Sequence, residues 1–111
     1  MSEVKPMIIT DNETGERYTL EFDKDSVRFA ERNGFDIDDL GRFPMTKLEE
    51  LFWYAFRKHH KRVDRIKANK LLYGIGKLPD NFTERLVTLY AEPFKGFDEG
   101  EEETTPFVTV E

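Results

Sequence analysis

Arg17-Tyr18-Thr19-Leu20-Glu21-Phe22 decides the fold, because its polar and apolar residues alternate as they do in a half-buried β-strand. A second β-prone run, Met7-Ile8-Ile9-Thr10, precedes it. The intervening Asp11-Asn12-Glu13-Thr14-Gly15 is a cluster of turn formers, and Gly15 is available for a positive φ. We therefore predict a β-hairpin. Because a two-stranded hairpin alone is only marginally stable in water, it must pack on the rest of the chain.

Helix signals follow the hairpin. Asp23 or Asp25 can cap a first helix, which Asn33-Gly34 ends. Residues 35–41 predict a single capped turn. The capping-box pattern Thr46-Lys47-Leu48-Glu49 predicts the start of the next helix.

That helix has no Pro or Gly to stop it before Gly74, but residues 57–62 are six consecutive polar residues, which favours a break there. A shorter helix then runs through Leu72 and closes at Gly74-Ile75-Gly76. A last helix starts at Pro79-Asp80-Asn81 and ends before Pro93.

The expected fold class is α+β: one domain over residues 1–96, with the N-terminal hairpin packed on a small bundle of about four helices. Residues 97–111 form an acidic tail that we expect to be flexible, with acidic residues at five of positions 98–103. The tail also contains the β-prone run Pro106-Phe107-Val108-Thr109-Val110, which could add a strand to the exposed hairpin edge of the same molecule or of a neighbour.

Composition indicates a soluble intracellular protein. The net charge is -6, and charged residues make up 36% of the 111 residues, against about 25% in an average domain. There are no cysteines, which excludes disulfides and thiolate chemistry. The sequence shows no signal peptide and no apolar run of the roughly 20 residues that a membrane helix needs.

No motif predicts catalysis, a cofactor or a metal. The adjacent His59 and His60 would point about 100° apart on a helix, so they cannot share one ion without a third ligand. We expect His59 on the core face and His60 in solvent. The expectation is a protein that is not an enzyme, without a catalytic, cofactor-binding or metal-binding residue.

The helix that starts at Thr46 predicts a binding surface. One apolar stripe consists of Leu48, Leu51, Phe52 and Ala55. A second stripe, of Trp53, Phe56 and His60, lies about 100° to 200° around the helix axis. This second stripe is either core or left for a partner. With two neighbouring arginines, the candidate partner-binding residues are Trp53, Phe56, Arg57, His60 and Arg62.

The basic stretch 57–70 holds seven Lys and Arg residues against the single acidic residue Asp64. A helix with these cations could bind the phosphates of a nucleic acid, so a small nucleic-acid-binding protein is one alternative. The negative charge of the whole domain favours a solvated or protein-binding face instead.

The order of the elements resembles the tail assembly chaperones of long-tailed bacteriophages and prophages. The likeness covers about residues 7–92. It depends on the hairpin ending in Tyr18-Thr19-Leu20-Glu21-Phe22, the helix reaching Glu31-Arg32-Asn33-Gly34, and Leu48-Glu49-Glu50-Leu51-Phe52-Trp53-Tyr54-Ala55. The basic stretch 57–70 departs from that family by its charge.

The resemblance implies a function that consists of binding other proteins and involves no catalysis. Such chaperones bind the long helical tape measure protein and help to recruit tail tube subunits. They act in the host cell cytoplasm and are absent from the mature virion; a homo-oligomer is also compatible with this role. A minor structural virion protein, such as a head–tail connector, is a further alternative.

Overall fold

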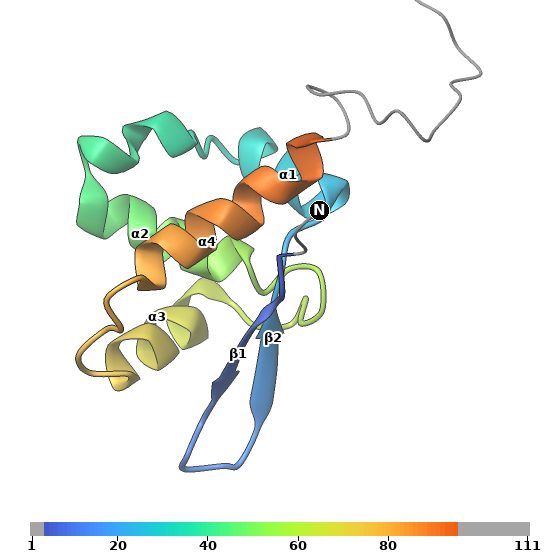
Figure 1. Cartoon of the computed structure of the whole chain (residues 1–111). Helices are drawn as coiled ribbons and strands as arrows, with labels where there is room; N and C mark the ends of the chain where they lie inside the picture. The colour runs from blue at the N-terminus through green and yellow to red at the C-terminus, as the bar shows by residue number, and fades with distance from the viewer. Residues whose placement is uncertain (1–3, 96–111) are drawn as a thin grey trace, which may run out of the picture.

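The computed structural model describes residues 4–95 and has the expected α+β architecture (Figure 1). Two antiparallel strands, β1 (Met7–Thr10) and β2 (Arg17–Leu20), precede four α-helices. The helices are α1 (Lys24–Arg32), α2 (Pro44–Tyr54), α3 (Arg65–Gly74) and α4 (Phe82–Ala91). Two 3-10 turns, η1 (Ile37–Gly41) and η2 (Glu92–Phe94), follow α1 and α4. The flexible tail and the β-prone run predicted at 97–111 lie outside the described residues.

The hairpin forms as its sequence predicts. Met7 pairs with Leu20 and Thr10 with Arg17, and the Asp11 N–H donates to the Glu16 carbonyl at 2.8 Å. Gly15 closes the loop with φ of 80°, a conformation that costs other residues energy. β2 ends at Leu20, two residues earlier than predicted, and the Glu21 N–H that follows it donates to the Ala55 carbonyl at 3.0 Å.

α1 has the predicted ends. The Asp23 side chain accepts from the Ser26 N–H at 2.8 Å, and the Ser26 hydroxyl accepts from the Asp23 N–H at 2.8 Å, a reciprocal capping box. Gly34, with φ of 88°, follows the helix. The single turn predicted at 35–41 is η1, and the Asp36 carboxylate accepts from the Asp38 N–H at 3.0 Å at its start.

The predicted start of α2 is wrong by two residues. Pro44 begins the helix, and no side chain caps it, so the pattern at Thr46 is not a capping box. Proline suits a first helical position because it has no N–H to leave unpaired and its φ is already helical.

The break predicted at 57–62 is confirmed. α2 ends at Tyr54, and α3 begins only after Asp64, whose carboxylate accepts from the Lys67 N–H at 2.8 Å. α4 starts at Phe82 as expected, and Pro93 lies within η2 directly after it.

The core lies between the helices and one face of the hairpin. Aromatic rings pack edge to face, among them Phe22 against Tyr90 at 5.1 Å and Phe35 against Tyr54 at 5.5 Å between ring centres. Burial, with a smaller contribution from nearby carboxylates, raises the pKa of Tyr90 to about 12, so its phenol is neutral. Within residues 4–95, no helix has the length and apolar character to span a bilayer.

Candidate partner-binding surface

Phe56 belongs to the core and not to a partner-binding surface. Its side chain is 0% exposed and packs against Phe52 at 5.2 Å and Tyr18 at 5.6 Å between ring centres. The reason is its spacing, because a residue four positions after the buried Phe52 lies above it on the same side of a helix. The hairpin then covers Phe56 through Tyr18.

The two histidines have the reverse of the predicted roles. His59 is exposed, and its Nε2 lies 2.8 Å from the Glu21 carboxylate. His60 is half-buried: its Nε2 accepts a hydrogen bond from the Thr19 N–H at 2.9 Å, and its ring packs edge-on against Tyr18 at 5.2 Å. His60 therefore closes the outer edge of β2 and is not free to bind a partner.

The environment of His60 favours its neutral form. Burial and the neighbouring His59 lower the pKa of His60, against the opposing effect of Glu16. The hydrogen bond requires the same state, because an imidazole nitrogen accepts only when it carries no proton. The hydrogen bond between the hairpin and the 55–64 loop is therefore lost when acid protonates His60.

Trp53 lies at the surface, half-buried, between three elements. Its Nε1–H donates to the Val63 carbonyl at 3.0 Å, and its ring packs edge-on to Phe29 at 6.4 Å. The Arg65 guanidinium lies 5.7 Å from the ring centre. Trp53 therefore anchors the loop before α3 and still presents part of its ring to solvent.

Arg57 contributes to a basic hollow of about 340 Å³ that α1 shares with the 55–64 loop. Its guanidinium carbon lies 3.9 Å from the centre of the Phe29 ring. The cations around the hollow are Arg28, Arg32, Arg57, Lys58 and Lys61. Sequence reasoning missed Arg28 and Arg32; their i, i+4 spacing on α1 was the available signal. Arg62 is exposed on the same loop but does not line the hollow.

The basic stretch 57–70 does not form one face, contrary to the helix that we considered. The break before α3 leaves Arg57 and Lys61 beside α1, whereas Lys67 and Lys70 lie beside the hairpin. Arg65 is paired with the Glu50 carboxylate at 3.1 Å.

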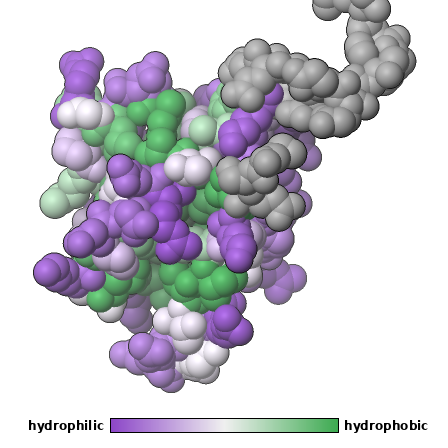
Figure 2. Space-filling model, in the orientation of Figure 1, coloured by the Kyte–Doolittle hydropathy of each residue, from purple (hydrophilic) through white to green (hydrophobic). Residues whose placement is uncertain are grey.

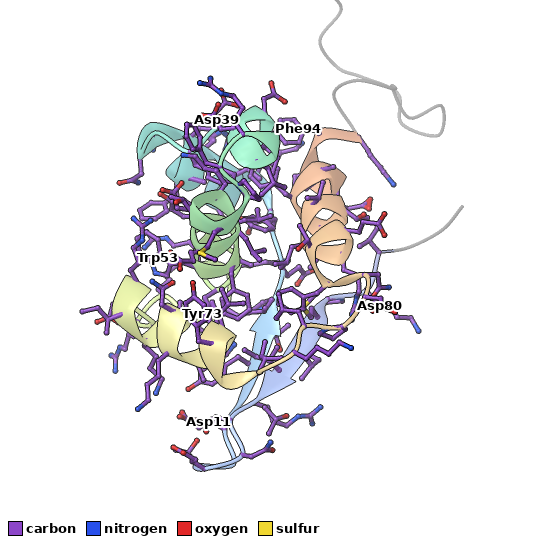
Figure 3. All side chains as sticks on the ribbon, turned by 90° about the vertical axis from the view of Figure 1, so that its left-hand side faces the viewer. Asp11, Asp39, Trp53, Tyr73, Asp80 and Phe94 are labelled. Atoms are coloured by element: carbon purple, nitrogen blue, oxygen red, sulfur yellow. The ribbon has the colours of Figure 1, made fainter. Side chains whose placement is uncertain are left out.

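A second, more apolar surface is formed by α2 and α3, and we call it the α2–α3 face. It consists of Met45, Glu49 and Trp53 on α2 with Ile66 and Tyr73 on α3. Met45, Ile66 and Tyr73 are 70%, 81% and 58% exposed. Met45, Glu49 and Trp53 follow one another at i, i+4 spacing, and the Tyr73 hydroxyl donates to the Glu49 carboxylate across the helices. Figure 3 shows Trp53 and Tyr73 on the side toward the viewer, where α2 lies above α3.

The described residues contain no cluster of three His, Asp or Glu side chains that could hold a metal ion. What residues 4–95 present is an apolar face next to a cationic hollow, with Trp53 adjoining both.

No curated protein and no solved structure matches the chain significantly. A family model does match, over residues 1–111, and the chain belongs to that family, DUF5055, a domain of unknown function.

Proposed function

We propose that this protein is a tail assembly chaperone of a long-tailed bacteriophage or prophage, which binds the tape measure protein and tail tube subunits during assembly. The observation that carries the proposal is the α2–α3 face, where a small charged domain leaves Met45, Ile66 and Tyr73 largely uncovered. Exposed apolar side chains gathered on one face mark a protein-binding surface more often than a solvated one. The order of hairpin, helix, single turn and helix also supports the resemblance.

The face suits an amphipathic helix. A client helix could place its apolar side chains against Met45, Trp53 and Tyr73, as helix-in-groove recognition does. The neighbouring hollow, with Arg57 and Lys61, would accept acidic residues that flank the apolar ones. Trp53 is the strongest candidate anchor, because tryptophan contributes disproportionately to binding energy.

The test is co-purification of the full chain with a coexpressed tape measure fragment. Met45→Asp places a charge on the α2–α3 face at a position that is 70% exposed, so we expect the fold to remain and binding to fall at least tenfold. Ile8→Asp is the matched control, since Ile8 is 45% exposed and lies on the hairpin, whereas Met45 lies on α2.

Trp53→Ala should weaken binding as well, with circular dichroism to verify that the variant folds. If Ile8→Asp abolishes binding and Met45→Asp does not, the partner uses the hairpin and the assigned face is wrong. If the unaltered chain binds neither tape measure nor tail tube fragments, the chaperone proposal itself fails.

The basic hollow favours one second candidate, a nucleic-acid-binding protein. Five cations from two elements converge there, although Arg28 is paired with Asp25 at 3.0 Å and Lys58 with Glu21 at 3.2 Å. A gel shift separates the two candidates, because phosphate binding must weaken steeply as salt rises. Mass spectrometry of purified particles tests the remaining alternative, a head–tail connector, which would be retained in the virion.

A further inference from the structure

The two edges of the hairpin differ. The outer edge of β2 is closed, since the Thr19 N–H donates to His60 and the Glu21 N–H to Ala55. The register places Ile8 opposite Thr19 and Thr10 opposite Arg17. Both are non-hydrogen-bonded pairs of the antiparallel ladder, and the residues of such pairs direct their N–H and C=O groups away from the partner strand. The N–H and C=O groups of Ile8 and Thr10 therefore face outward from β1, and no hydrogen bond to either N–H occurs among residues 4–95 beyond the sheet itself.

A groove of about 780 Å³ runs along this open edge, between β1 and α3. Its apolar lining comes from Ile8 and Ile9 on the hairpin, Ile66, Leu71 and Ile75 on or next to α3, and Phe82 at the start of α4. Figure 2 shows apolar surface over β1 in the lower part of the view, with α3 beside it in Figure 1. Unpaired backbone groups beside apolar side chains are what an added strand requires.

We propose that the segment Phe107-Val108-Thr109-Val110 of the same chain occupies this groove as a third strand on β1. The segment has the β-branched and aromatic residues that strands prefer, with no Gly or Pro within it. Its alternate side chains would enter the apolar lining, while its backbone pairs with Ile8 and Thr10.

The chain between Lys95 and Phe107 is long enough to bring the segment to the groove. The last described residue, Lys95, lies beyond the far end of α4, whose ten residues rise about 15 Å from Phe82 in the groove. With η2 added, the tail must return roughly 20 to 25 Å. The 12 residue steps from Lys95 to Phe107 span up to about 40 Å when extended.

The charges of the tail and of the residues near α4 favour the same path of the tail along α4 to the groove. The acidic residues at 98–103 precede the segment, and a tail that returns along α4 brings them past Lys5 and Arg85. Arg85 lines the groove itself, as do Lys67 and Lys70. Lys5, Lys70 and Arg85 form no ion pair with any residue of 4–95, so their charges are available to the tail. Three acidic residues, Asp11, Glu13 and Asp64, also line the groove and would oppose the acidic run if it entered there.

Amide hydrogen exchange of the full chain, followed by NMR, tests the proposal residue by residue. We expect the Ile8 and Thr10 amides to be protected in the full chain. A chain shortened to residue 105 should expose them, with exchange at least tenfold faster. The Ile9 amide, which pairs with Tyr18 in β2, is the internal control and should keep its rate.

The variant Phe107→Asp/Val108→Asp keeps the length and should have the same effect as the truncation. Equal exchange at Ile8 and Thr10 in the full, shortened and substituted chains would overturn the proposal. Protection that depends on protein concentration, in a protein that elutes as a dimer, would also overturn it, because the strand would then come from a second copy.

Discussion

At the scale of single residues, two aromatic rings three positions apart have opposite roles. Trp53 is half-buried on α2 and presents part of its ring to solvent, whereas Phe56 is enclosed beneath the hairpin. Both are large and apolar, so composition does not separate them. Their neighbours do, because Phe56 lies one helical turn after the buried Phe52 and is covered by Tyr18 of the hairpin.

Phe56→Ala should remove about 3–5 kcal/mol from the free energy of unfolding, since it leaves a large cavity among packed rings. Phe43→Ala is the matched control, because Phe43 is 49% exposed, and we expect a loss below about 1 kcal/mol. Urea unfolding monitored by circular dichroism measures both. Similar losses in the two variants would contradict the placement of Phe56 in the core.

His60 predicts a dependence of stability on pH. Its folded-state pKa is lowered below the ordinary value of 6.5, so the unfolded chain binds the proton more readily. The stabilisation is complete above pH 6.5 and is lost as the pH falls through the lower, folded-state pKa. Unfolding midpoints between pH 7.5 and 5 should fall in the native chain.

His60→Gln should flatten that pH dependence, because glutamine can accept from the Thr19 N–H without titrating. His59→Gln is the control and should retain most of the fall, since His59 contacts the Glu21 carboxylate and not the Thr19 N–H, and it is the smaller cause of the lowered His60 pKa. A His60→Gln variant with an unchanged slope would show that another group is responsible.

At the scale of elements, helix ends follow local rules where a polar cap or a glycine is present. Asp23 and Asp64 start α1 and α3 through side-chain hydrogen bonds, and Gly34 follows α1 with a positive φ. α2 is the exception, since its start depends on Pro44 and no side chain caps it.

Gly34→Ala should destabilise the protein by about 1–2 kcal/mol, because a side chain disfavours the left-handed backbone that ends α1. The space around Gly34 is open, so the effect is purely conformational. Gly41→Ala is the control: Gly41 is equally open but has no positive φ, and its substitution should be neutral or slightly stabilising. Thermal unfolding compares the two, and equal effects would refute the conformational explanation.

At the scale of the whole molecule, the hairpin depends on the helices. Its buried residues, Met7, Tyr18 and Leu20, are covered by the helical part, and the 55–64 loop closes its β2 edge.

A peptide of residues 4–23 should therefore be largely unstructured in water, because two strands alone bury too little surface. NMR of the peptide should show no cross-strand contacts between Ile8 and Thr19, which are present in the full chain. A peptide that forms the native register alone would show that the turn, and not the helices, stabilises the hairpin.

The sequence by itself determined the elements, because these arise from short-range patterns. The alternation in β2, the turn formers before it, the caps at Asp23 and the polar run at 57–62 all act within a few residues of one another. The α+β class and the break between α2 and α3 follow from them. The exposed apolar residues Met45 and Tyr73 had no such signal, since each lies within an ordinary helical pattern.

Only the tertiary structure decided which side chains are free to bind. Once α2 ends at Tyr54, the direction of each later side chain depends on how the loop packs against the hairpin, a contact between residues about 40 positions apart. That contact buries Phe56, ties His60 to β2 and separates the cations of 57–70 onto different surfaces. Helical periodicity cannot reveal this, because it describes one helix axis and the chain changes direction there.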